Sequence, residues 1–351
     1  MPNILLKLIN YISLPFRYAE YRLNRVHPLW CTFAVTENCN GRCRYCQYWR
    51  RRHADLPTAE VLKIVRRLKQ LGIKSIVFSG GECILRPDLA EIVAFTSRLG
   101  MEATVVTNGI LGSEALYESL MSCGLQGLAF SLDGSSAAVH EAFRNGCFFN
   151  KVVAAIQAAV QVRNRSGFPT RIATTTVVNR LNVGELREIF ELRKSLGADK
   201  NYFQPVWPIY GEQDFHERFG FADMSLAELE NLAKELCRIP DGNLEEYYGL
   251  IPQLYRDFRH IPLQYRCFAG RAFVYVDSSG GLYPCSPLTH EPMGSLLNDD
   301  FMADLGRPEL QERLSRYDRY ACGGCTMACY LEKNIILSTL QNPARLWRRA
   351  K

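Results

Sequence analysis

Three cysteines stand close together in the stretch ENCNGRCRYCQYW, residues 37–49. Cys39, Cys43 and Cys46 have the spacing C-x3-C-x2-C, and the next cysteine is Cys83. Thiolates hold iron–sulfur clusters, and a 4Fe–4S cluster with protein ligands alone needs four of them. Three thiolates leave one iron open to a reactant, as a catalytic zinc site leaves a position for its substrate. The spacing therefore predicts a cluster that binds a small molecule; a zinc site and buried reduced thiols are the alternatives.

A second set of five cysteines lies near the end of the chain. It reads C-x17-C and then, after a long gap, C-x2-C-x3-C, and consists of Cys267, Cys285, Cys322, Cys325 and Cys329. The chain has 13 cysteines, an odd number, and eight of them belong to these two sets, which favours metal binding in a reducing compartment over a disulfide scaffold. A structural zinc ribbon is the alternative for this set. Four cysteines outside both sets are expected to be core thiols: Cys31, Cys123, Cys147 and Cys237.

The elements that position these thiols follow from the hydrophobic pattern. Short runs rich in β-branched residues predict strands at 31–36, 76–78, 103–107, 128–131, 171–178 and 201–206. Helical patterns between them predict helices from Thr58 onward and at about 88–99, 113–123, 150–165 and 183–196. This alternation predicts an α/β fold with a parallel sheet, a partial (β/α)6 TIM-like barrel. Active sites of such barrels lie at the carboxyl ends of the strands, and the first cysteine set directly follows the first strand.

The predicted organisation has five parts. They are an amphipathic basic helix at 1–30, the barrel at 31–210, a helical bridge at 211–260, a small cysteine-rich domain at 261–335 and a basic tail at 336–351. Within the bridge, helices are expected near 225–237 and 244–258, and within the cysteine-rich domain a hairpin is expected from strands at 272–276 and 282–283. The aromatic stretch 207–221 is expected either to line a substrate pocket or to pack between the domains.

Charge and hydropathy limit the partners. The formal net charge of +6 is divided among the two ends and the region of Arg50, which does not suggest a broad nucleic-acid surface. No run reaches the roughly 18 apolar residues of a membrane span, and no cleavage site follows the apolar start, so a cytoplasmic protein is expected. Apolar positions at 4, 5, 8, 9 and 12 share one helical face. This helix is expected to pack on the barrel, and peripheral contact of the basic, amphipathic ends with the inner membrane surface is the lesser alternative.

The first cysteine set resembles the signature of the radical S-adenosylmethionine (SAM) superfamily, C-x3-C-x-aromatic-C, with Tyr45 as the aromatic residue. The resemblance spans residues 31–206 and implies the partial barrel. It also implies that the open iron of a 4Fe–4S cluster chelates SAM. Reductive cleavage of SAM then gives a 5′-deoxyadenosyl radical, which abstracts a hydrogen atom from the substrate.

Further segments resemble the family's SAM contacts in the same order along the chain. Gly80, Gly81 and Glu82 match a GGE motif that receives the SAM amino group, although Cys83 stands where many members have proline. His140 and Arg144, in the stretch HEAFR, match a segment whose arginine often faces the SAM carboxylate. The SAM-binding residues implied by the resemblance are Tyr45, Gly80, Gly81, Glu82, Asn108, Ser131, Asp133, Arg144, Asn179 and Gln204. Several of these end a predicted strand, where ordinary turn chemistry is the alternative.

The second cysteine set resembles the auxiliary-cluster region of the SPASM and twitch subfamilies. Full SPASM domains have seven cysteines and two auxiliary clusters, whereas this chain has five, so one auxiliary 4Fe–4S cluster is expected. Cys267, Cys285, Cys322 and Cys325 would complete its ligation, with Cys329 spare or replacing one of them. Such a cluster can accept the electron left on a substrate radical or hold the substrate, and the number of thiolates favours the first.

The resemblance implies a radical SAM enzyme that dehydrogenates or cross-links its substrate. A small metabolite is expected; a peptide or protein side chain and a membrane lipid are the alternatives. Cys39 comes too early in this sequence for an N-terminal leader-binding domain, which lowers the weight of leader peptides. The expected electron donor is a protein such as flavodoxin or ferredoxin. The competing class is a non-enzymatic zinc-binding protein.

Overall fold

The computed structural model describes residues 18–21, 23, 25–50, 54–206, 218–221, 223–240, 243–256, 265–317, 325 and 327–339. Its centre is a nine-stranded sheet in the order β6-β5-β4-β3-β2-β1-β7-β8-β9. The first six strands are β1 (Trp30–Thr36), β2 (Ser75–Gly80), β3 (Glu102–Thr107), β4 (Gly127–Ser131), β5 (Arg171–Val178) and β6 (Lys200–Pro205). All six are parallel. The predicted α/β class and partial barrel are therefore confirmed.

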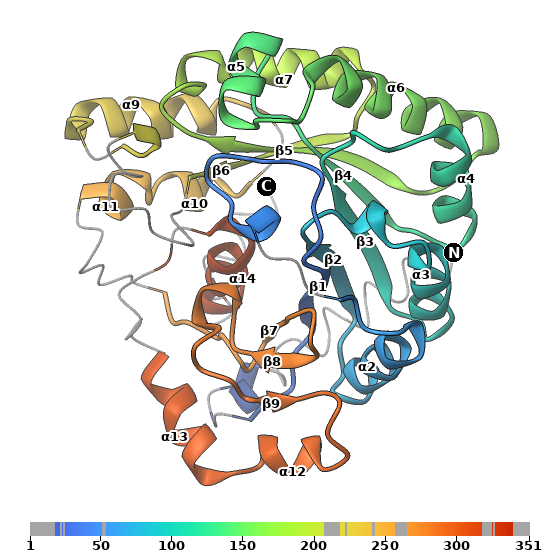
Figure 1. The fold of residues 1–351 in the computed structure, drawn as a ribbon. Coiled ribbons are helices and arrows are strands. Elements are labelled where there is room, and N and C mark those ends of the chain that lie inside the picture. Colours follow the sequence, from blue (N-terminus) through green and yellow to red (C-terminus); the bar gives the residue numbers. More distant parts are fainter. Residues whose placement is uncertain are drawn as a thin grey trace.

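The helices between these strands cover the outer face of the curved sheet (Figure 1). They are α2 (Thr58–Gln70), α3 (Leu89–Arg98), α4 (Glu114–Ser122), α5 (Ala137–Phe143), α6 (Phe149–Ser166) and α7 (Leu186–Ser195). Helix α2 buries Val61, Ile64, Val65 and Leu68, the i, i+3, i+4, i+7 spacing of one helical face. Helix α6 ends at Gly167, whose φ of 66° is the left-handed conformation that favours glycine at this position.

The bridge region differs in one respect from the prediction. Helix α9 (Leu226–Cys237) forms as expected, but the helix predicted for 244–258 is two short helices, α10 (Glu245–Tyr248) and α11 (Ile251–Arg256). Gly249 and Pro252 lie at the break. Glycine is a poor helix former, and proline is tolerated in the first turn of the second helix because its missing N–H has no partner there. The aromatic residues 207–215 lie outside the described residues.

The C-terminal hairpin extends the barrel sheet. Strand β7 (Phe273–Val276) pairs in parallel with β1, so that Trp30 lies opposite Phe273 and Phe33 opposite Val276. Strands β8 (Gly281–Tyr283) and β9 (Gly294–Ser295) then continue the sheet in antiparallel order. The predicted hairpin is confirmed, and β1, the strand that leads into the first cysteine set, has the second cysteine region as its neighbour.

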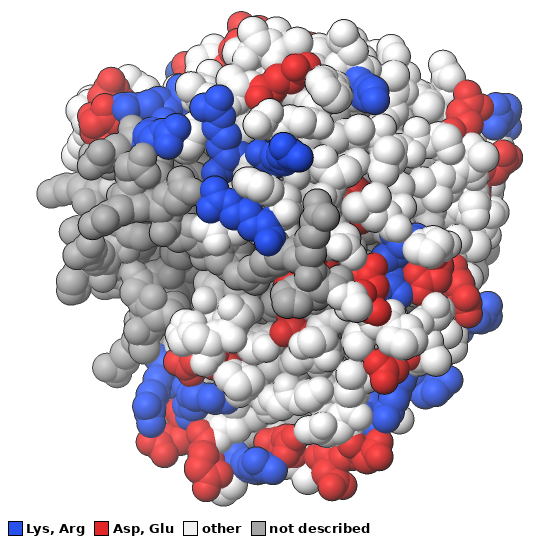
Figure 2. Space-filling view, in the orientation of Figure 1, with Lys and Arg blue, Asp and Glu red and all other residues white. Residues whose placement is uncertain are grey.

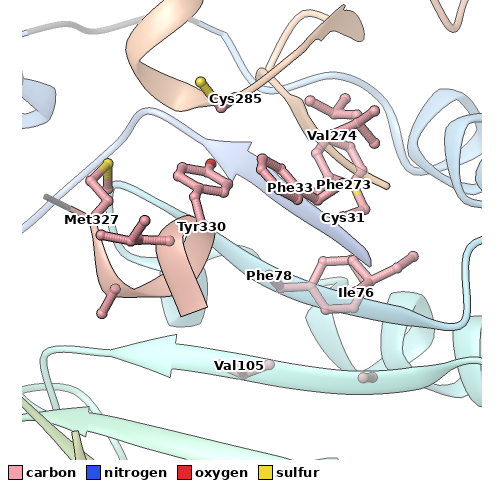
Figure 3. Close-up of a cluster of buried hydrophobic side chains, with 14 of the residues drawn as sticks. Cys31, Phe33, Ile76, Phe78, Val105, Phe273, Val274, Cys285, Met327 and Tyr330 are labelled. Carbon is pink, nitrogen blue, oxygen red and sulfur yellow. The ribbon is translucent and has the colours of Figure 1, made fainter. Parts of the chain in front are cut away.

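Helix α14 (Ala328–Thr339) lies inside the curve of the sheet, between α10 and β7 (Figure 1). The Tyr330 ring of this helix stacks on Phe273 with centroids 5.1 Å apart. These rings join the core formed by Phe33 and Phe78 of the first two strands, and Cys285 lies beside them (Figure 3). The C-terminal segment and the barrel therefore share one hydrophobic core. The short helices α12 (Phe301–Leu305) and α13 (Pro308–Arg316) lie beyond β9.

The ends of the chain are described in part. No helix among the described residues is long and apolar enough to span a bilayer. The amphipathic stretch of residues 4–12 and the basic tail from 340 onward, on which the prediction of membrane contact rests, lie outside the described residues. Tyr18 and Tyr21, which follow the N-terminal stretch, pack against Phe268 at ring-centroid distances of 5.7 and 6.1 Å.

Candidate functional site

The first cysteine set lies on the loop between β1 and the short 3-10 helix η1 (Tyr48–Arg50), at the carboxyl ends of the parallel strands. Cys43 is buried, and Cys39 and Cys46 are partly exposed. All three are free thiols. Burial raises the pKa of Cys39 to about 12, and the neighbouring sulfurs of Cys43 and Cys46 act in the same direction.

The GGE segment holds this loop by its backbone. The N–H of Gly81 donates to the Thr36 carbonyl and that of Glu82 to the Asn38 carbonyl, each at 2.8 Å. There is no room here for a side chain: a Cβ on Gly80 would stand 2.2 Å from the Thr36 oxygen, and one on Gly81 would stand 2.1 Å from the Asn38 oxygen. Gly80 also has a φ of 121°. Gly80 is therefore required by the close approach of the end of β2 to the end of β1, and Gly81 by the close approach to the cysteine loop.

Glu82 ties the cysteine loop to the next strand. Its carboxylate is almost fully buried and accepts hydrogen bonds from the N–H groups of Asn108, at 2.7 Å, and Ile84, at 3.2 Å. Burial raises the pKa of this carboxyl, and the hydrogen bonds oppose that shift. The Asn108 side chain in turn donates to the side-chain oxygen of Asn40 at 2.7 Å. Both predicted SAM contacts therefore also position the loop.

A buried ion pair stands beside the loop. Arg144 donates through Nε to Asp133 at 2.5 Å, and the second carboxylate oxygen of Asp133 accepts from the Val177 N–H at 2.7 Å. The Asp133 N–H donates to Nδ1 of His140. His140 is fully buried, and desolvation, together with the Arg144 charge, lowers its pKa to about 3. This histidine is therefore neutral at physiological pH.

The end of α5 and the turn after it are hydrogen-bonded to the cysteine loop. The Arg42 N–H donates to the Asn145 carbonyl at 2.8 Å, and the Arg44 N–H to the Phe143 carbonyl at 3.1 Å. The Tyr45 ring stacks on Phe143 with centroids 4.5 Å apart, and the Arg144 guanidinium lies 5.4 Å from the centroid of Tyr45. Tyr45 and Arg144, which the sequence reasoning named separately, are thus brought together.

The remaining predicted contacts lie at the ends of strands. Ser131 is the last residue of β4 and is buried, and Gln204 of β6 lies half-buried opposite Val177. Asn179 is fully buried in the turn after β5, where its side chain donates to the Val177 carbonyl and accepts from the Leu181 N–H. The turn chemistry considered as an alternative thus accounts for the observed bonds of Asn179.

One residue beside the cysteine loop was missed by the sequence reasoning. Cys147 was expected to be an ordinary core thiol, and it is buried, but its sulfur lies 4.0 Å from the sulfur of Cys43. A hydrogen bond from Cys147 lowers the pKa of Cys43. The two cysteines are 104 residues apart in the sequence, and no local pattern links them. Cys31, by contrast, is a core thiol of β1 as predicted.

The second cysteine set comes from three segments. Cys267 and Cys285 are buried on either side of the β7–β8 hairpin, and Cys325 and Cys329 lie before and within α14. The Phe268 N–H donates to the Asn334 side chain at 2.9 Å. The Ser286 N–H donates to the Tyr330 hydroxyl at 3.1 Å. Each segment that carries a cysteine is thus bonded to α14, and Cys322 lies outside the described residues.

The donor chemistry fits iron–sulfur clusters. Among the residues that the structure describes, no three His, Cys, Asp or Glu side chains stand close enough together to hold a metal ion. Three free thiols nevertheless share the short loop 39–46, and four further described free thiols lie on α14, just before it or on segments hydrogen-bonded to it. Thiolates are the ligands of such clusters. A thiol-rich loop at the carboxyl ends of the strands of an open α/β barrel is the arrangement of a cofactor-dependent enzyme.

Comparisons with known proteins agree with this class. The family model described as "Radical SAM superfamily" matches residues 33–193. An AdoMet-dependent heme synthase of Methanosarcina barkeri is 27% identical over 278 residues, which cover 74% of this chain and 77% of that protein. A PqqA peptide cyclase of Gluconobacter oxydans is 32% identical over 258 residues, which cover 72% of this chain and 68% of that protein.

A solved structure has the same fold. This is anSMEcpe with bound AdoMet and Cp18Cys peptide, which aligns with a TM-score of 0.62 and 16% identity and covers 92% of this chain and 99% of that one. The chain belongs to the radical SAM superfamily and is an enzyme of that class. Its cofactors are accordingly SAM and a 4Fe–4S cluster, and the non-enzymatic zinc protein is set aside.

Proposed function

We propose that this radical SAM enzyme abstracts a hydrogen atom from a peptide side chain and passes the remaining electron to an auxiliary 4Fe–4S cluster, giving a dehydrogenation or a cross-link. The observation that carries the substrate class is the 32% identity to a protein named PqqA peptide cyclase over 72% of this chain. This gives the peptide, expected above to be an alternative, more weight than the small metabolite.

Cys39, Cys43 and Cys46 are the proposed ligands of the first cluster, whose bound SAM supplies the 5′-deoxyadenosyl radical. The proposed SAM contacts are those named from the sequence. Glu82 and Asn179 act mainly by shaping their loops, because their side-chain oxygens already accept backbone hydrogen bonds. The stacked Tyr45 and Phe143 rings and the buried Phe219 give one side of the site an apolar wall that keeps water away.

The auxiliary cluster is assigned to Cys267, Cys285, Cys322 and Cys325 of the second cysteine set, with Cys329 spare or replacing one of them. The pairing of β1 with β7 supports its role, since the loop proposed to hold the first cluster follows β1, and Cys267 and Cys285 flank the hairpin whose first strand is β7. The hydroxyls of Tyr48, beside that loop, and Tyr275, on β7, are 2.9 Å apart and fix the two regions to each other.

Charge at the mouth of the barrel fits acidic partners. Arg42, Arg44 and Arg50 are exposed on the cysteine loop and η1, and Lys and Arg side chains gather on the face that carries this loop (Figure 2). A peptide with carboxylate side chains and an acidic electron donor such as flavodoxin or ferredoxin both match this charge. The relative named AdoMet-dependent heme synthase favours a second candidate substrate, a small carboxylated metabolite.

Iron analysis tests the two clusters. Anaerobically reconstituted protein should hold about eight irons per chain, four for each 4Fe–4S cluster. Cys43→Ala and Cys285→Ala should each lose about half of that iron, and Cys123→Ala, which removes a thiol from neither set, should lose none. If the single variants Cys285→Ala and Cys267→Ala both keep full iron, the auxiliary site is refuted.

Deuterium transfer tests the substrate class. The enzyme is incubated with SAM, reductant and the peptide fraction of cells grown in deuterated medium, and the 5′-deoxyadenosine is analysed by mass spectrometry. Deuterium should enter this product, and digestion of the fraction with protease beforehand should abolish the transfer. Transfer that resists the protease and follows the small-molecule fraction would select the carboxylated metabolite.

A further inference from the structure

We propose that Cys147 is a positioning residue of the first cluster, whose thiol donates a hydrogen bond to the sulfur of Cys43 and makes the cluster easier to reduce. This inference rests on the proposed ligand role of Cys43. The two sulfurs are 4.0 Å apart and both side chains are buried, so water does not compete for either one.

The direction of the bond follows from the ligand. Cys43 bound to iron is a thiolate and accepts hydrogen bonds, whereas an ordinary thiol keeps its proton at neutral pH and can donate it. Cys147 is therefore the donor. Its contact is with the sulfur of Cys43 itself, so it acts directly on an atom whose electron density changes when the cluster is reduced.

The turn after α5 holds Cys147 in place. Two backbone hydrogen bonds join this turn to Arg42 and Arg44, on either side of Cys43. A third, from the Cys147 N–H to the Arg144 carbonyl at 2.9 Å, closes the turn itself. The thiol therefore has little freedom to leave Cys43.

Gly41 leaves the space that Cys147 occupies. A Cβ on Gly41 would stand 2.9 Å from the Cys147 sulfur, closer than real Cβ contacts, while the nearest other atoms are at 3.7 and 3.8 Å. Any side chain at position 41 would displace the thiol from its contact.

The effect on the cluster follows from charge. Reduction adds an electron to the cluster, and a hydrogen bond to a ligating sulfur stabilises the added negative charge, which raises the reduction potential. Loss of this one hydrogen bond should lower the ratio of reduced to oxidised cluster at a fixed potential by up to about tenfold. For a one-electron couple, tenfold corresponds to about 59 mV.

The test is a redox titration that measures the midpoint potential of the SAM-binding cluster. The cluster is monitored by its electron paramagnetic resonance signal, which is identified because it changes when SAM is added. Cys147→Ala should lower the potential, and Gly41→Ala, which keeps the thiol but displaces it, should lower it too. The potential of Cys147→Ser, which retains a hydrogen-bond donor, should lie between those of Cys147→Ala and the wild type. Cys123→Ala, a matched thiol deletion elsewhere, should have the wild-type potential.

Two results would overturn the proposal. One is an unchanged potential in Cys147→Ala and Gly41→Ala with full iron content. The other is a loss of iron in Cys147→Ala equal to that in Cys43→Ala, which would make Cys147 a ligand. If Cys147→Ala does not fold, the Gly41→Ala potential decides. Failure of the parent assignment is seen separately, as full iron in Cys43→Ala.

Discussion

Gly81→Ala should separate the cysteine loop from the end of β2. The new methyl carbon would stand 2.1 Å from the Asn38 carbonyl oxygen and 2.7 Å from that of Glu37. Both obstacles are backbone atoms of the loop that carries Cys39, so a change of side-chain rotamer cannot relieve the clash.

The magnitude follows from what must move. Inserting a methyl group into a packed site costs typically about 1–3 kcal/mol. Moving the loop also weakens the hydrogen bonds from Gly81 to Thr36 and from Glu82 to Asn38, each worth about 0.5–1.5 kcal/mol. We expect Gly81→Ala to lower the free energy of unfolding by about 2–5 kcal/mol and to reduce the iron retained by the first cluster.

Urea unfolding and iron analysis on anaerobic protein measure both effects. Gly184→Ala is the matched control, because a Cβ at Gly184 meets no atom within 4 Å and its backbone needs no positive φ. If Gly81→Ala is as stable as Gly184→Ala and holds as much iron, the close approach of β2 to the cysteine loop is wrong.

Two further predictions concern the buried ion pair and the histidine beside it. Asp133→Asn leaves the buried Arg144 charge without its partner and should cost about 3–5 kcal/mol in urea unfolding; the exposed pair of Glu114 and Arg165 is the control, and Glu114→Gln should cost less than about 1 kcal/mol. Equal costs for Asp133→Asn and Glu114→Gln would contradict the burial of the Asp133–Arg144 pair. The pKa of His140 is lowered to about 3, because the histidine is buried and lies near Arg144, so the unfolded chain takes up a proton below about pH 6.5 that the folded chain refuses. Stability is therefore full above pH 6.5 and is lost as the pH falls, by about 1.4 kcal/mol at pH 5.5. His140→Gln should flatten this dependence of stability on pH. An unchanged slope of stability against pH in this variant would contradict the role of His140.

The sequence predicted those features that are local in the chain. The spacing of Cys39, Cys43 and Cys46, the strand before them and the glycines after the second strand are each visible within a few residues, and parallel topology then places strand ends at one edge of the sheet. The regular alternation of strands and helices likewise predicted the barrel, with helix boundaries correct to within three residues. The exceptions are α5, which was not predicted, and the helix expected at 244–258, which Gly249 and Pro252 divide.

Contacts between distant segments were not predictable. Cys147 looked like a core thiol, because its partner Cys43 is 104 residues away. The family motif suggested that Glu82 faces the cofactor, but the structure adds its bonds to the N–H groups of Asn108 and Ile84, which depend on how two loops pack. The parallel pairing of β7 with β1 also has no signal in the sequence, since a hairpin can dock on either edge of a sheet.

The central claim is that three thiolates leave one iron of the cluster open for SAM. It is tested most directly by anaerobic incubation of the reconstituted enzyme with SAM and dithionite, followed by quantitation of 5′-deoxyadenosine and methionine. The wild type should form both products in equal amounts, and Cys43→Ala should form neither. Product formation that persists in Cys43→Ala, or a wild-type enzyme with a full first cluster that leaves SAM uncleaved, would contradict the account.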